Sequence, residues 1–518
     1  MANDRPRVAL GRTRSGLTRR ALLRDAALGA TVAVAARSGA PWPRPAVAAE
    51  STPAAEREPQ AEAAYVPRPN RTQLAIAVGE TSIAPDRGPP ATAVLANGTL
   101  PGPEIRVRQG DLLRILVENR LPSSPTSIHW HGLLVPAAMD GVPDVSNAPI
   151  APGRTYVYEY PIRQSGTYWY HSHFGFQEQL GCYGAFVIEA ASETAVADRD
   201  AVVLLGDWLH RSPSAVFAAL RGEKPATAGA EKGGGDMKMA GSATPGGMKM
   251  AIGGADLSDV EYDAFLLNGR GPSDPWTMAV RAGERIRLRL INGGASTYFR
   301  VALDGHRLQV THADGLAVEP VVVDHLLMGM GETYDAVVEI ARAGSFTLHA
   351  VAQDDSGQAI GVLHTSDAAP APDRAMPTFA GRALAYADLR ATAPTTLPDG
   401  PLQSFRLPLA GDMARYVWTI GGQAWPKADP LLIRRGQRVA LELVNESGMW
   451  HPMHLHGHFF RVLQGAGDRC PLKHTVNVAP RATVRIEFAA DNPGSWFFHC
   501  HNAYHLEAGM AREVEYVA

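Results

Sequence analysis

The sequence predicts an all-β fold of three consecutive β-sandwich domains, because one strand-rich pattern occurs three times. Each copy opens with a turn glycine and then alternates apolar and polar residues up to an asparagine, as a half-buried strand does. The three copies are VRQGDLLRILVEN (107–119), VRAGERIRLRLIN (280–292) and IRRGQRVALELVN (433–445). A second unit follows each copy and runs glycine, small hydroxyl residue, aromatic residue, two further residues and histidine. Its copies are GTYWYHSH (166–173), GSFTLHAV (344–351) and GSWFFHCH (494–501).

Length and composition agree with several strand-rich domains. The chain has 518 residues, a length that suggests about three or four domains. Its 51 glycines and 39 prolines favour strands and turns over long helices. The repeats predict domains at approximately 66–195, 196–366 and 395–518. Residues 222–255, in the second domain, are rich in glycine and carry methionines, which predicts a mobile surface insertion.

The first 48 residues are predicted to be an export signal of the twin-arginine type. The pair Arg19-Arg20 precedes a short, alanine-rich apolar run, and Ala46-Val47-Ala48 is an acceptable small-residue cleavage site. The alternative is a disordered basic tail. No other stretch approaches the roughly 18 apolar residues of a membrane span. We therefore expect a mature protein that acts in the periplasm or outside the cell.

The net charge of −3 gives no electrostatic reason to expect a nucleic-acid partner or an anionic membrane surface.

Histidines gather at four places in the first and third repeats. Of the 18 histidines, ten fall into these clusters: His129 and His131; His171 and His173; His451, His454 and His456; and His499, His501 and His505. The middle repeat has His349-Ala350-Val351 where the others have two histidines one residue apart. A metal site shared by the first and third domains is therefore predicted. The remaining histidines are interpreted as ordinary core or surface residues.

The third repeat also contains a cysteine in an unusual setting. Cys500, His505 and Met510 provide a thiolate, an imidazole and a thioether, the ligands of a blue-copper electron-transfer site. Such a site needs one more imidazole. In an extended strand, neighbouring side chains point to opposite faces. Cys500 should therefore face one metal, while His499 and His501 face another.

With these four motifs, nearly the whole mature chain resembles the multicopper oxidases, the family of laccases, ascorbate oxidase and bacterial cuprous oxidases. The closer match is to the bacterial copper-resistance oxidases, through GTYWYHSHFGFQEQLG, NGRGPSDPWT, QAWPKADPLLIRRGQ and YHLEAGM. The resemblance implies cupredoxin-like Greek-key domains, a monomer and four copper ions. It also implies oxidation of a reductant in one-electron steps, coupled to reduction of dioxygen to water.

The resemblance also assigns ligands. The type 1 copper would be bound by His451, Cys500, His505 and axial Met510, and the type 2 copper by His129 and His454. The type 3 pair would be bound by His131, His171, His173, His456, His499 and His501. Electrons would pass from Cys500 through His499 and His501. Asp140 matches the family's carboxylate near the dioxygen site, although it is also a plausible turn residue before Gly141. Some relatives carry a glutamate between the last ligands, where this chain has Asn502, Ala503 and Tyr504.

Two reductants fit the sequence. Thioethers suit Cu(I), and the 222–255 insertion contains Met237, Met239, Met248 and Met250 in two Met-Lys-Met units. Met449 resembles a position near the family's substrate copper, but Ser447 and Gly448 replace further ligands found in some relatives. The alternative reductant is a phenol or similar aromatic donor.

Proteins of two other classes are also considered. A copper nitrite reductase would lack the full type 3 histidine set, so that class is excluded. A non-enzymatic periplasmic copper-binding protein would be expected to lack several of the twelve ligands that this sequence has.

Two cysteines have no predicted metal. Cys182 and Cys470 lie in the two domains that should meet at the cluster, and export favours disulfides. A Cys182–Cys470 bridge is one prediction. Two buried free thiols are the alternative.

Overall fold

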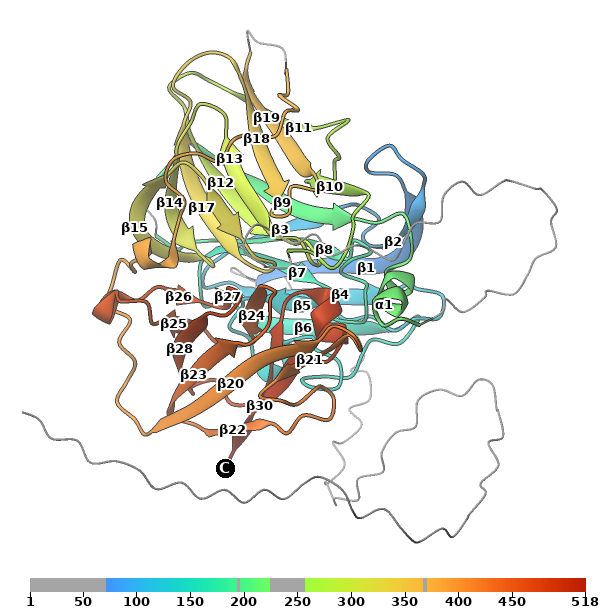
Figure 1. Cartoon of the computed structure of the whole chain (residues 1–518), viewed down its shortest axis with the longest axis vertical. Helices are drawn as coiled ribbons and strands as arrows, with labels where there is room; N and C mark the ends of the chain where they lie inside the picture. Colours follow the sequence, from blue (N-terminus) through green and yellow to red (C-terminus); the bar gives the residue numbers. More distant parts are fainter. Residues whose placement is uncertain (1–70, 193–195, 224–256, 367–369) are drawn as a thin grey trace, which may run out of the picture. The chain divides into compact units, whose positions relative to one another are not determined.

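The computed structural model describes residues 71–192, 196–223, 257–366 and 370–518. Within them the strands form six sheets, which follow the chain in three pairs (Figure 1). The strands of the three pairs span residues 71–189, 199–365 and 402–517. The predicted all-β fold is confirmed, while the domain boundaries themselves stay a prediction. The predicted export signal and nearly all of the 222–255 insertion lie outside the described residues.

The first pair joins a sheet of order β2-β1-β4-β6 to one of order β3-β8-β7-β5. Alternate residues of β4, Leu113, Ile115 and Val117, share one core with Tyr168 and Phe186 of the other sheet. Because both inner faces bury side chains in one core, the pair is a β-sandwich. Its strands are β1 (Arg71–Ile83), β2 (Ala91–Ala96), β3 (Gly102–Arg108), β4 (Leu112–Asn119), β5 (His129–His131), β6 (Thr155–Pro161), β7 (Gly166–His171) and β8 (Tyr183–Glu189).

The second pair joins the sheets β10-β9-β12-β17-β14-β15 and β11-β19-β18-β13-β16. Leu288 and Leu290 of the first sheet share a core with Val301 and Leu348 of the second. The strands are β9 (Arg199–Trp208), β10 (Ala264–Leu267), β11 (Trp276–Val280), β12 (Arg285–Asn292), β13 (Phe299–Leu303), β14 (Leu308–Ala313), β15 (Leu316–Val323), β16 (Leu326–Met328), β17 (Thr333–Glu339), β18 (Ser345–Ala352) and β19 (Gln358–Thr365).

The third pair joins the sheets β21-β20-β23-β28-β25-β26 and β22-β30-β29-β24-β27. Its core contains Leu441 and Ile486 of the first sheet, together with Met453 and Cys500 of the second. The strands are β20 (Leu402–Asp412), β21 (Val417–Ile420), β22 (Leu431–Arg434), β23 (Arg438–Asn445), β24 (His451–Leu455), β25 (Phe460–Val462), β26 (Leu472–Lys473), β27 (Thr475–Val478), β28 (Thr483–Ala489), β29 (Ser495–Cys500) and β30 (Ala511–Val517).

The sequence repeat is also a repeat in structure. Strands β4, β12 and β23 each pair in parallel with the first strand of their sandwich and antiparallel with a later one. The glycine that opens each copy has a positive φ, which side-chain-bearing residues rarely adopt: Gly110 (94°), Gly283 (81°) and Gly436 (84°). The asparagine that ends each copy is buried, and its side-chain amide donates to backbone carbonyl oxygens. Asn119 donates to Ser124 and Ile150, Asn292 to Thr297 and Met328, and Asn445 to Met449, Val478 and Ala479.

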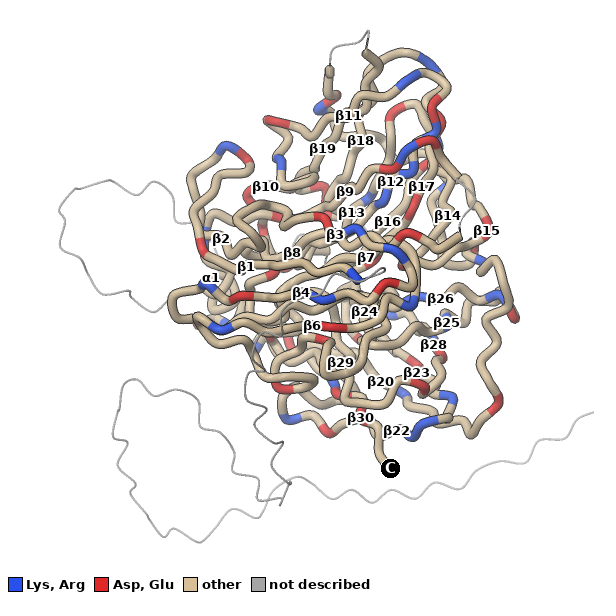
Figure 2. Tube along the Cα trace, turned by 180° about the vertical axis from the view of Figure 1, so that it is seen from behind, with Lys and Arg blue, Asp and Glu red and all other residues tan. Residues whose placement is uncertain are grey.

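Helices are few among the described residues. The α-helices are α1 (Pro213–Leu220) and α2 (Ala503–Glu507), and short 3-10 turns lie at Ala137–Met139, Tyr386–Asp388 and Gly467–Arg469. None of these helices has the length and apolar character needed to cross a membrane. Basic and acidic residues occur in all three pairs of sheets (Figure 2).

The predicted Cys182–Cys470 disulfide is wrong. Both cysteines are buried free thiols, so the alternative holds. Cys182 packs into the core of the first sandwich, where burial raises the pKa of its thiol to about 12. The Cys470 thiol instead donates to the carbonyl oxygen of Gly467, three residues before it. Each side chain is thus occupied within its own domain.

Candidate metal centre

Six of the ten clustered histidines lie on two pairs of neighbouring strands, and the other four follow the ends of these strands. In the first sandwich, His129 of β5 is the register partner of His171 of β7. In the third, His454 of β24 is the partner of His499 of β29, and Met453 is the partner of Cys500. Pairing between strands therefore brings together histidines that are far apart in the sequence.

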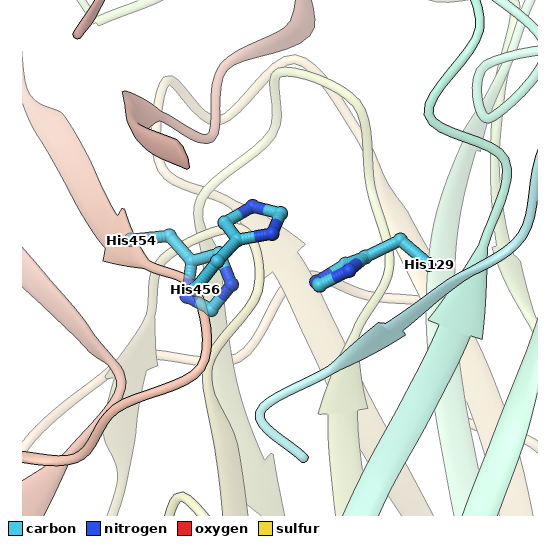
Figure 3. A group of neighbouring side chains, drawn as sticks. All are labelled: His129, His454 and His456. Atoms are coloured by element: carbon cyan, nitrogen blue, oxygen red, sulfur yellow. The ribbon is translucent and has the colours of Figure 1, made fainter. Parts of the chain in front are cut away.

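The two sandwiches contribute to one cluster. The ring of His129 faces the rings of His454 and His456, which come from one segment of the third sandwich (Figure 3). The ring centroids of His129 and His456 are 3.9 Å apart, and those of His131 and His454 are stacked at 3.8 Å. All four rings are buried. The structure thus brings histidines of the first and third sandwiches together, as the predicted shared metal site requires.

Two further rings, those of His173 and His499, join His456, and their nitrogens point at one another. His499 Nε2 lies 3.0 Å from His456 Nε2 and 3.5 Å from His173 Nε2. His456 donates its Nδ1–H to Asp140 Oδ2 at 2.9 Å, and His499 donates its Nδ1–H to the carbonyl of Cys500 at 2.9 Å. Because an acceptor at Nδ1 leaves a neutral ring with its lone pair at Nε2, at least two lone pairs meet here. A bound cation would relieve their repulsion.

Several other ring nitrogens in the described residues are buried and have no hydrogen-bond partner. They are His129 Nε2, His131 Nδ1, His171 Nε2, His454 Nε2 and both nitrogens of His501. His129 and His454 each donate their Nδ1–H to a carbonyl, that of Asp140 and of His474, both at 2.8 Å. Such contacts orient metal-binding imidazoles. The donor set fits a group of metal ions with nitrogen ligands.

Burial also keeps these imidazoles neutral. It is the largest cause that lowers the pKa of His499 to about 3, and a backbone contact with Cys500 opposes it. Burial and neighbouring histidines hold the pKa well below its usual range for His131, His173, His454, His456 and His501. A neutral imidazole can bind a metal without first losing a proton.

Cys500 lies in a second, separate set of ligand atoms. Its Sγ is 3.7 Å from His451 Nδ1 and 3.6 Å from His505 Nδ1, and Met510 is fully buried in the same core. Burial, with the charge of Asp259 as a smaller cause, raises the pKa of the Cys500 thiol well above its usual range. A thiolate here therefore requires a bound cation.

Comparison with known proteins identifies the family. Profiles described as "Multicopper oxidase" match residues 77–193, 199–368 and 401–517. The chain belongs to the multicopper oxidase family. It is 37% identical to "Multicopper oxidase MmcO" of Mycobacterium tuberculosis, over 83% of this chain and 85% of that protein. It is 35% identical to "Copper resistance protein A homolog" of Pseudomonas syringae pv. tomato, over 86% of this chain and 92% of that protein.

A solved structure supports the fold. The laccase of Botrytis aclada is 28% identical, with a TM-score of 0.70 over 86% of this chain and 87% of that one. The predicted cupredoxin-like sandwiches are confirmed. As a multicopper oxidase, the protein is an oxidoreductase that uses copper.

Sequence reasoning missed two carboxylates of this multicopper oxidase. Glu178 Oε2 lies 2.7 Å from His171 Nδ1, and burial raises the pKa of this carboxyl well above its usual range. Asp259 Oδ2 lies 3.0 Å from His505 Nε2 and also accepts the Tyr416 hydroxyl at 2.5 Å. The only sequence signal is for Glu178, a charged residue five positions after His173 in an otherwise apolar and amide-bearing stretch.

His474 and Thr475 were also missed. His474, interpreted from sequence as an ordinary histidine, lies with its ring centroid 4.8 Å from that of His131 and 5.4 Å from that of His454. The Thr475 hydroxyl is within 3.3 Å of ring nitrogens of all three. The sequence KHTV gave no reason to connect it with the histidine clusters.

Proposed function

We propose that this multicopper oxidase binds four copper ions in two centres. The type 1 copper is held by His451, Cys500, His505 and Met510. The type 2 copper is held by His129 and His454, and the type 3 pair by His131, His171 and His501 and by His173, His456 and His499. Unpartnered ring nitrogens support a metal-binding role for five of these histidines: His129, His131, His171, His454 and His501.

One observation carries the proposal. Cys500 Sγ faces His451 and His505, whereas the adjacent His499 directs its Nε2 at His456 and His173. Consecutive residues of β29 thus belong to different centres. This arrangement links the two centres by one peptide unit and by the hydrogen bond from His499 Nδ1 to the Cys500 carbonyl.

Copper ions and amino-acid residues would have different roles in the reaction. When bound, copper supplies the electron storage and the dioxygen reduction that amino-acid side chains do not. The Cys500–His499 and Cys500–His501 segments connect the reductant side to the dioxygen side. Asp140 holds His456 through Oδ2, and its buried Oδ1 lies 3.4 Å from His129 Nδ1 without a hydrogen bond, which makes Asp140 our candidate for passing protons toward the product water.

The test of this assignment is Cys500→Ser. The variant should lose the blue thiolate absorption and the oxidase activity, while the copper bound by the clustered histidines remains. Copper content and visible absorption are measured on the same sample. A Cys500→Ser protein that is blue and active would overturn the assignment.

For the reductant, we favour Cu(I), oxidised to the less toxic Cu(II). The described residues on either side of the methionine-bearing insertion lie at the Cys500 centre. Before it, Phe217 of α1 packs with its ring centroid 6.1 Å from that of Tyr416; after it, Asp259 contacts His505. The insertion itself, with its two Met-Lys-Met units, lies outside the described residues. The copper-resistance names of relatives support the same substrate.

Oxidation of phenols is the second candidate, because the chain resembles laccases in sequence and structure. Replacing Met237, Met239, Met248 and Met250 by leucine distinguishes the two. If Cu(I) is the donor, the variant should oxidise Cu(I) more slowly at limiting copper and oxidise a phenol as fast as before. Equal rates of Cu(I) oxidation in the native protein and the variant would mean that the insertion is only a linker.

The place of action also stays a proposal. The Arg19-Arg20 signal supports export by the twin-arginine route to the periplasm or beyond, and we expect the mature protein to be a monomer.

A further inference from the structure

A turn of the middle sandwich reaches both outer sandwiches. Asp314 and Gly315 connect β14 to β15, and both have a positive φ (47° and 80°), as in the tight turns of β-hairpins. A Cβ added to Gly166, at the start of β7, would lie 2.1 Å from the Gly315 carbonyl oxygen. The turn therefore packs directly against the strand that carries His171.

On its other side, this turn holds the start of β27. Asp314 Oδ2 accepts the backbone N–H groups of His474 at 3.1 Å and Thr475 at 3.0 Å. Asp314 Oδ1 pairs with Lys473 Nζ at 3.0 Å, and the Lys473 and Asp314 side chains are fully buried. Three groups on three consecutive residues of the third sandwich are thus fixed by one carboxylate of the second.

The residues held in this way contact proposed copper ligands. The His474 carbonyl accepts the Nδ1–H of His454 at 2.8 Å. The Thr475 hydroxyl oxygen lies 3.2 Å from the same nitrogen, 3.3 Å from His131 Nε2 and 3.1 Å from His474 Nδ1. The contacts are mutually consistent if His131 donates to the hydroxyl and the hydroxyl donates to His474 Nδ1. His131 Nδ1 then keeps the lone pair, and it is the nitrogen left without a partner.

We propose that Asp314 and Thr475 are positioning residues for the copper ligands His131 and His454. The middle domain, which lacks the histidine pairs, would set the orientation of one ligand ring from each outer domain. This inference rests on the proposed copper cluster. Contacts of this kind, made to the nitrogen that does not bind metal, typically change metal affinity about 10–100-fold when removed.

The test compares copper retention in four variants. Thr475→Val removes the hydroxyl, whereas Thr475→Ser keeps it. Asp314→Asn weakens the anchor of β27. Asp335→Asn is the matched control for the contact with β27, because Asp335 is an equally buried carboxylate of the same sandwich that binds Arg287 and, on β7, Thr167. Each copper-loaded protein is titrated with a chelator, and copper content, the type 2 electron paramagnetic resonance signal and the blue absorption are followed.

Thr475→Val and Asp314→Asn should release copper and lose the type 2 signal at about 10–100-fold lower chelator concentration. Their blue absorption should be unchanged, because the Cys500 centre contacts neither residue. Thr475→Ser and Asp335→Asn should behave as the native protein. Retention of copper by Thr475→Val with a native type 2 signal would overturn the inference, as would equal loss in Asp335→Asn. Thr475→Val answers the question even if Asp314→Asn fails to fold. A native protein without blue or type 2 copper would instead refute the proposed function.

Discussion

The stability of the copper-free protein should fall steeply with acid. Burial lowers the pKa of His474 to about 4 and that of His499 to about 3, whereas an imidazole in an unfolded chain titrates near 6.5. The unfolded state therefore binds more protons than the native state as the pH falls. The stability contributed by the neutral rings is present above about pH 6.5 and is lost progressively between that pH and the native pKa values.

The expected magnitude follows from these values. At pH 5 the unfolded rings are protonated while His474 and His499 stay neutral in the native state. A difference of about 1.5 units at about 1.4 kcal/mol per unit gives about 2 kcal/mol for each ring, or about 4 kcal/mol for both. Seven further rings with a strongly lowered pKa act in the same direction: His131, His171, His173, His451, His454, His456 and His501. A loss of about 4 kcal/mol is comparable with the whole stability of many domains.

Urea unfolding of the copper-free protein at about pH 7.5, 6 and 5 measures this loss. The copper-loaded protein is the control: its curve should lie higher but run parallel, because the native rings are neutral in both forms over this range and only the unfolded rings take up protons. A loss below about 1 kcal/mol in the copper-free protein would refute the reasoning.

Two further changes test the cluster and the scaffold separately. Asp140→Asn weakens the acceptor of the His456 N–H, so copper should be released at about 10–100-fold lower chelator concentration. An unchanged release curve would mean that Asp140 does not support copper binding. Asn445→Ala leaves the carbonyls of Met449, Val478 and Ala479 without their donor and should cost about 1–3 kcal/mol in urea unfolding at neutral pH, with the blue absorption retained in the folded fraction. A cost near zero for Asn445→Ala would mean that water replaces the amide.

The sandwich fold could be predicted because its signals are local. The alternation in β4, β12 and β23, their opening glycines and their closing asparagines all lie within 13 consecutive residues of each copy. The same local chemistry builds the same turn and the same buried amide three times. The pairing of the sheets into sandwiches then follows from the need to bury the apolar face of each strand.

The site was predictable only in part, because the proposed ligands stand in recognisable sequence motifs and the residues that support them do not. The histidines stand in short motifs with strand spacing, so each motif can be recognised alone. Asp259 and Thr475 have no motif, since each contacts a histidine from a distant segment, and Glu178 has only its place seven residues after its partner His171. The cysteine prediction failed for a related reason: that Cys182 and Cys470 lie in the two domains that build the site does not determine where their side chains point.

On the proposed ligand assignment, the middle sandwich supplies no copper ligand and still positions ligands of the two outer sandwiches. Its Asp314-Gly315 turn leaves no room for a side chain at Gly166, so its position is tied to β7 and to His171. The carboxylate of Asp314 ties the same turn to the start of β27, and through Thr475 to His131 and His454. Any displacement of the turn must therefore move both halves of the cluster or break contact with one. Because a bound metal ion tolerates little change in ligand position, the proposed copper cluster would constrain this turn, although neither Asp314 nor Gly315 is a proposed ligand.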